Sequence, residues 1–198
     1  MAHLNPEISG KSIVITEKIS SICVLFSGIL LLLAVGLIGV EVVLRKVFTV
    51  SIGGADELSS YALAICISWS LGYALLHKAH IRIDVLYCKL SDKLKAGLDV
   101  LSLLSLIAFM APLTFFAFSL LSVSIARNST ANTPLQTPMW IPQGLWFLGL
   151  LAFLVTIAIV LCSTVYYLLK KDYVRAQHIS GVTTIEEEIA EETGLHID

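Results

Sequence analysis

Four long stretches without a charged residue limit what this sequence can fold into. They cover residues 19–40, 58–77, 100–126 and 128–169. A water-soluble domain could not bury such runs, whereas about 20 apolar residues rising ~1.5 Å each cross a ~30 Å hydrocarbon layer. Composition agrees, because 57% of the residues are hydrophobic and 14% are charged, against about a quarter charged in soluble domains. The sequence therefore predicts an all-α membrane protein with four transmembrane helices.

The boundaries of the spans follow from these runs. We expect the spans at about residues 17–44, 58–77, 98–126 and 144–169. Each must be helical, because an isolated strand would leave backbone groups unpaired in lipid. The first run is too long for the apolar part of a typical signal peptide, so we interpret it as a retained span. The predicted organisation is an N-terminal tail (1–16), a four-span membrane domain (17–170) and an acidic C-terminal tail (171–198).

The distribution of Lys and Arg predicts an orientation. Three of the 13 basic residues, Arg45, Lys46 and Arg127, lie on the side opposite the termini. The other ten lie in the N-terminal tail, the connection after the second span and the C-terminal tail. Basic residues concentrate on the cytoplasmic side of membrane proteins. We therefore expect both termini in the cytoplasm.

The connection between the second and third spans has a helical pattern of its own. Its apolar residues at helical spacing are Ile83, Leu86, Tyr87, Leu90, Leu94 and Leu98. Charged residues fall mostly between them, which is typical of an amphipathic helix lying in the membrane interface. We expect such a helix within residues 79–97, running into the third span, and the alternative is a solvated turn.

Small residues recur every fourth position along the second span. One series is Ser60, Ala64, Ser68 and Gly72, and the other is Ala62, Cys66, Ser70 and Ala74. Ridges of small residues let neighbouring helices approach closely in a membrane. The pattern favours a second span that lies between other helices. The alternative is that small residues are simply common in membrane helices.

Ionisable residues are almost absent from the interiors of the spans, and burying one there costs ~2.5–3.5 kcal/mol or more. Glu41 lies near the end of the first span, and Arg45 follows four residues later on the same helical face. This spacing favours a structural ion pair over an ion pathway. Asp56 and Glu57 open the second span, where negative side chains suit a helix N-terminus.

The sequence shows no pattern typical of a catalytic, cofactor or metal site. The four cysteines form no Cys-x-x-Cys pair, which favours apolar packing roles. His77, His80 and Asp84 are spaced so that they could approach one metal ion on a helix, but polar residues are expected at the end of a span. A haem-binding helix would need histidines within the spans. We therefore expect no enzyme activity and no bound cofactor.

The segment from Glu41 to Leu86 resembles the small membrane subunit of tripartite ATP-independent periplasmic (TRAP) transporters, the DctQ-like family. The residues that carry the resemblance are Glu41, Arg45, Asp56, Glu57, Tyr61, Trp69 and the run His80-Ile81-Arg82-Ile83-Asp84-Val85-Leu86. Four spans and the chain length agree with it. One departure is visible: the family often carries Trp shortly before the acidic pair, and Gly53-Gly54-Ala55 stand there in this chain.

The resemblance implies a role in the bacterial inner membrane. In this family a periplasmic binding protein captures an organic acid, and a large permease subunit moves it inward with sodium, which binds that partner subunit. The small subunit braces the permease and helps to form the docking surface. The structural or partner-interface residues so implied, together with those of the small-residue ridges, are Glu41, Arg45, Asp56, Glu57, Tyr61, Ser68, Trp69, Gly72, His80 and Asp84.

Two other functions compete with this one. The first is a stand-alone membrane carrier or small membrane enzyme that uses Glu41, Asp56 or His80. The second is a sensor or assembly factor that acts through the acidic C-terminal tail.

Overall fold

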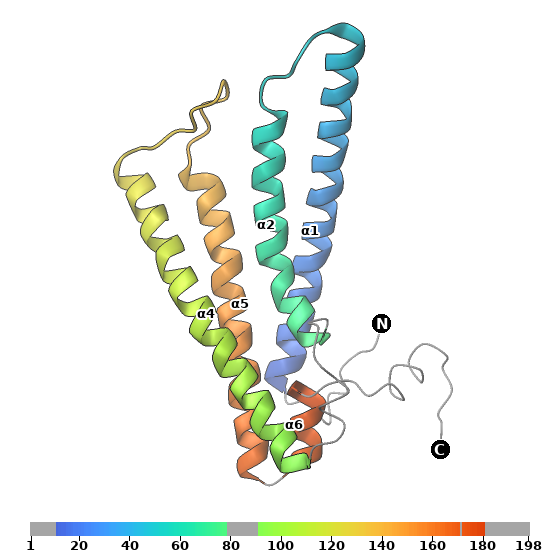
Figure 1. Cartoon of the computed structure of the whole chain (residues 1–198), viewed down its shortest axis with the longest axis vertical. Helices are drawn as coiled ribbons and strands as arrows, with labels where there is room; N and C mark the ends of the chain where they lie inside the picture. The colour runs from blue at the N-terminus through green and yellow to red at the C-terminus, as the bar shows by residue number, and fades with distance from the viewer. Residues whose placement is uncertain (1–10, 79–90, 171, 181–198) are drawn as a thin grey trace, which may run out of the picture. The chain divides into compact units, whose positions relative to one another are not determined.

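The structure is a computed structural model that describes residues 11–78, 91–170 and 172–180 (Figure 1). Its helices are α1 (Lys11–Val43), continued by the π-helical turn η1 (Leu44–Phe48), α2 (Ala55–Leu76), α4 (Asp92–Ala126), α5 (Trp140–Leu169) and α6 (Tyr173–Ser180). Four of these are long and apolar enough to cross a membrane. Within the described ranges the only β-type pairing is an isolated bridge between Thr130 and Pro138. The predicted all-α fold with four spans is confirmed.

The helices extend beyond the apolar runs from which they were predicted. α1 begins at Lys11 and α5 at Trp140. Hydrophobicity determines which part of the chain can lie in lipid, but a helix can continue beyond that part. Pro142 is tolerated in α5 because it lies in the first turn, where the backbone N–H has no intrahelical partner. Most of the predicted interfacial helix (residues 79–90) lies outside the described residues. Its last part, from Asp92, is the beginning of α4.

The chain divides into two compact units. Unit 1 comprises the described parts of Met1–Lys18, Ala74–Ala108 and Val155–Asp198. Its core contains residues from every segment, and the most buried of them are Ile13, Leu103, Ile157, Thr164 and Ala176. The short helix α6 belongs to this unit and buries Ala176 and Ile179.

Unit 2 comprises Ile19–Tyr73 and Phe109–Leu154. Within it α2 lies between α1 and α5 (Figure 1), as the small residues of the second span predicted. On one side the thiol of Cys66 lies 3.0 Å from the carbonyl oxygen of Ser27 in α1. On the other side the indole N–H of Trp69 donates to the carbonyl of Leu145 in α5 at 2.9 Å. These contacts hold the three helices together.

The two ridges of small residues are buried over only part of their length. Ser68 and Gly72 of the first ridge are buried, but Ser60 and Ala64 are exposed within the chain. At Ser68 the reason for a small side chain is visible, because a Cβ placed on Gly149 of α5 would collide with the Ser68 hydroxyl and lie 2.6 Å from Cδ1 of Trp69. Close packing in unit 2 therefore depends on Gly149 as much as on α2.

Candidate functional site

The polar residues of unit 2 gather where its helices meet two connections, residues 49–54 and residues 127–139. We call this region the loop end. α1 reaches it through η1, which ends at Phe48 and is followed by Thr49 in the left-handed conformation (φ 54°). Thr49 takes a position that most helices give to Gly or Asn, and Gly53 also has a positive φ of 76°. These two residues let the chain reverse direction between α1 and α2 in six residues.

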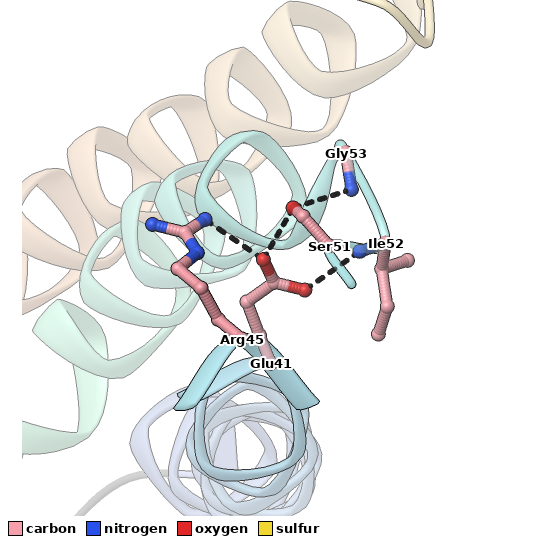
Figure 2. Close-up of polar contacts among 5 residues, drawn as sticks. All are labelled: Glu41, Arg45, Ser51, Ile52 and Gly53. Carbon is pink, nitrogen blue, oxygen red and sulfur yellow. Dashed lines mark hydrogen bonds and ion pairs between the residues drawn. The ribbon is translucent and has the colours of Figure 1, made fainter. Parts of the chain in front are cut away.

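Glu41 holds the 49–54 connection in place (Figure 2). Its carboxylate accepts hydrogen bonds from the Arg45 guanidinium at 2.8 Å, the Ser51 hydroxyl at 2.5 Å and the Ile52 backbone N–H at 2.9 Å. The Ser51 hydroxyl in turn accepts from the Gly53 N–H at 3.1 Å. The ion pair expected from the spacing of Glu41 and Arg45 is therefore present, and it is one part of a larger network.

Burial distinguishes the two members of this ion pair. The Glu41 side chain is 5% exposed and that of Arg45 is 60% exposed. A carboxylate removed from water needs its lone pairs satisfied, and three donors from its own segment achieve this. We conclude that Glu41 acts as an acceptor that fixes a loop.

Glu57 makes a second network at the loop end, with the other connection. Its carboxylate accepts from the Tyr61 hydroxyl at 2.9 Å and from the Thr133 hydroxyl. The Tyr61 oxygen also lies 3.4 Å from the sulfur of Met139. Glu57 and Tyr61 on α2 therefore attach the 127–139 connection, which precedes α5.

Leu135 of that connection packs against Gly54. A Cβ on Gly54 would collide with the end of the Leu135 side chain. Gly54 lies in the Gly53-Gly54-Ala55 segment that precedes the acidic pair Asp56 and Glu57. The absence of a side chain at Gly54 leaves room for the Leu135 side chain.

Asp56, Arg45 and Lys46 remain accessible at the loop end. Two hollows adjoin them. One, of about 230 Å³, lies between the two connections and includes Glu41, Asp56, Glu57 and Thr133 in its lining. The other, of about 250 Å³, lies beside α1. No group of three His, Cys, Asp or Glu side chains that could hold a metal ion occurs in the part of the chain that the structure describes.

The remaining residues singled out from the sequence fall in two places. Ser68, Trp69 and Gly72 lie on α2 and contribute to its packing within unit 2. His80 and Asp84 lie outside the described residues, so the possible metal set with His77 has no structural description. The loop-end partners that sequence reasoning missed are Ser51, Ile52, Thr133 and Met139. Only Ser51 gave a signal, as a short polar residue beside Gly53 in a brief connection.

Taken together, these contacts define a class of protein. It is a multi-span α-helical membrane protein whose carboxylates at the loop end hold its own connections. The described contacts give Glu41 and Glu57 hydrogen-bond donors as partners.

A comparison with family models assigns the chain more closely. Residues 34–167 match the family described as "Tripartite ATP-independent periplasmic transporters, DctQ component". The chain belongs to the DctQ family. The match covers the whole loop end, the end of α1, all of α2 and α4 and nearly all of α5, and it makes the protein a component of a TRAP transporter and not an enzyme. No curated protein and no solved structure matches the chain.

Proposed function

We propose that this DctQ component braces a large permease subunit in the bilayer and does not itself carry the substrate. In this proposal a periplasmic binding protein captures an organic acid, and the permease moves the acid inward with sodium bound to the permease. Both termini of the present chain lie in the cytoplasm. The loop end then faces the periplasm, where it contributes to the surface on which the binding protein docks.

The absence of ionisable groups from the interiors of three of the spans carries this proposal. Residues 19–40, 100–126 and 128–169 contain no Asp, Glu, Lys, Arg or His, and an ion or proton path through a membrane protein is normally marked by such residues. Helices α1, α2, α4 and α5 are also continuous through their apolar stretches. Many secondary carriers instead bind substrate where helices are broken near the middle of the bilayer.

Glu41 supports the same conclusion. A carboxylate that translocates a cation must exchange its partners, but Glu41 is enclosed by three donors of its own segment. If Glu41 released these donors, the Ile52 N–H and the Ser51 hydroxyl would lose their acceptor. This arrangement favours a structural role over that of a carrier residue.

Reconstitution tests the proposal against a stand-alone carrier. The chain alone in liposomes is expected to give no sodium-dependent uptake of any organic acid. The chain together with the co-purified large subunit and the binding protein is expected to give uptake. Uptake by the chain alone that is abolished in Glu41→Gln would overturn the proposal, as would purification of the tagged chain without any large membrane partner.

Reporter fusions test the orientation separately. A green fluorescent protein fused to either terminus is expected to fluoresce, because it folds in the cytoplasm and not after export through the general secretory route. An alkaline phosphatase inserted after Thr133 is expected to be active, because that enzyme needs the periplasm. The opposite pattern would contradict the orientation and leave the assembly test unaffected.

Deletion of residues 181–198 is expected to leave uptake intact, and loss of uptake would favour a role for the acidic tail.

A further inference from the structure

The hollow beside α1 combines an apolar wall with charges of both signs. It has a volume of about 250 Å³, and its lining consists of Ile38, Glu41, Val42, Arg45, Lys46 and Asp56. Along the helix the lining changes from aliphatic (Ile38, Val42) to cationic (Arg45, Lys46) within two turns. Asp56, in the first turn of α2, supplies the opposite charge.

The charges of the hollow fall into one closed pair and one open pair. Arg45 and Glu41 bond to each other at 2.8 Å and compensate one another. Lys46 and Asp56 are exposed, and neither side chain has a hydrogen-bond or ion-pair partner among the residues that the structure describes. What remains is one free cation and one free anion in the same hollow. Such a wall suits a ligand that carries both charges better than a ligand that carries only a negative one.

We propose that this hollow binds the headgroup of a phospholipid whose phosphate is linked to a primary ammonium, as in phosphatidylethanolamine. The hollow lies where an apolar span ends in cationic residues, which is the level of lipid phosphates in a bilayer. Lys46 and the free N–H groups of Arg45 bind the phosphate, and the carboxylate of Asp56 accepts a hydrogen bond from the ammonium. Figure 2 shows one terminal nitrogen of Arg45 directed at Glu41 and the other directed away from it.

The size and the apolar wall define how much of the lipid enters. Pockets that enclose a drug-sized ligand measure ~300–1,000 Å³, so a hollow of about 250 Å³ suits the headgroup and glycerol. Ile38 and Val42 then contact the first carbons of the acyl chains. The rest of each chain follows the exposed surface of α1, where Val35 and Leu31 are exposed. The Glu41 network contributes to the site by holding Arg45 in place.

Native mass spectrometry of the full chain, purified in mild detergent with its partner subunits, tests this proposal. The protein is stripped of lipid and exposed to equal amounts of palmitoyl-oleoyl phosphatidylethanolamine and phosphatidylglycerol. We expect the former to be retained about fivefold more than the latter, the size of effect that one charge near a lipid surface gives. Asp56→Asn is expected to abolish this preference, and Lys46→Gln to weaken retention of both lipids about fivefold.

Two further variants separate a built site from general lipid adhesion. Val42→Trp fills the hollow and is expected to remove retention of both lipids. Arg127→Gln removes a cation that does not line the hollow and is expected to change nothing. Asp56 and Lys46 are exposed, so their variants should fold, and an unchanged elution volume checks this. Equal retention of both lipids by the wild type, stronger retention of phosphatidylglycerol, or wild-type behaviour of Val42→Trp and Asp56→Asn would overturn the proposal.

Discussion

The two sides of α2 in unit 2 are held by different kinds of interaction. Toward α1, the thiol of Cys66 contacts the carbonyl of Ser27 and the ring of Trp69 contacts Phe26. At the loop end, the Glu41 carboxylate fixes the connection between the two helices. Toward α5, the contacts include close packing at Gly149 and a hydrogen bond from Trp69. In the most apolar stretch of α1 only 11% of residues are buried, against 39% in α2 and 33% in α5.

This difference in burial identifies the helix surface that the chain itself leaves uncovered. A helix with more buried residues has more of its surface occupied by its own chain, as α2 does. A helix with few buried residues keeps most of its surface free for lipid or for another subunit, as α1 does in its most apolar stretch. Side-chain packing is a main source of helix association in lipid. We therefore expect changes on the α5 side to affect the stability of unit 2 most, and changes on the α1 side to act locally.

The largest effect is expected from Gly149→Ala. The new Cβ would collide with the Ser68 hydroxyl and lie 2.6 Å from Trp69 Cδ1, and overpacking of a tight contact costs roughly 1–3 kcal/mol. The loss is measured as a lower free energy of unfolding in a denaturing-detergent titration. An unchanged free energy of unfolding would show that the α2–α5 contact is loose. It would contradict the expectation that changes on the α5 side of α2 affect stability most.

A smaller loss is expected from Trp69→Phe. It removes the hydrogen bond to the carbonyl of Leu145 and retains most of the ring contact with Phe26, whose centroid lies 6.0 Å away. One intramolecular hydrogen bond contributes about 1 kcal/mol net. The same titration measures it. A loss as large as that of Gly149→Ala would show that the hydrogen bond stabilises the α2–α5 contact as much as close packing does.

Local effects are expected from Glu41→Ala. The change leaves Ser51 and the Ile52 N–H without their acceptor, so the connection over residues 49–54 loosens while the helices stay packed. Hydrogen–deuterium exchange followed by mass spectrometry should show about tenfold faster exchange in peptides that cover this connection. Glu41→Gln, which keeps an acceptor oxygen, should give a smaller increase.

Glu57→Gln is the matched control for this change. Its partners are Tyr61 and Thr133, so faster exchange is expected in residues 127–139 and not in residues 49–54. Equal acceleration of both connections by either variant would show that the two networks at the loop end act as one unit.

These contacts could be predicted from the sequence only where the two partners lie close together along the chain. Glu41 and Arg45 are four residues apart on one helix, so spacing alone predicted their contact. The bonds from Ser51 and Ile52 could not be predicted, because they depend on the path of a loop that begins with a left-handed Thr49. Thr133 and Glu57 are separated by 76 positions, and no local pattern in a sequence specifies such a pair.

The packing of α2 was predictable only in part, for a related reason. Small residues at every fourth position indicated that the second span has close neighbours, because that inference needs only the periodicity of a helix. They did not indicate which neighbour each ridge meets, nor that Ser60 and Ala64 stay exposed within the chain. That depends on Gly149 and Ser27, which lie on other helices and follow no pattern shared with α2.

The smallest effect, with the opposite sign, is expected from Gly28→Ala on α1. Nothing lies within 4 Å of a Cβ built at Gly28, and replacing Gly by Ala in a helix interior stabilises it by about 0.5–1 kcal/mol. In the isolated chain the free energy of unfolding should therefore rise slightly, whereas Gly149→Ala lowers it. The two variants make the same chemical change on two membrane helices, so the opposite signs isolate the effect of packing. Gly28→Ala could also lower the yield of the complex with the large subunit while it stabilises the chain alone. That result would show that this face of α1 is a contact surface for the large subunit.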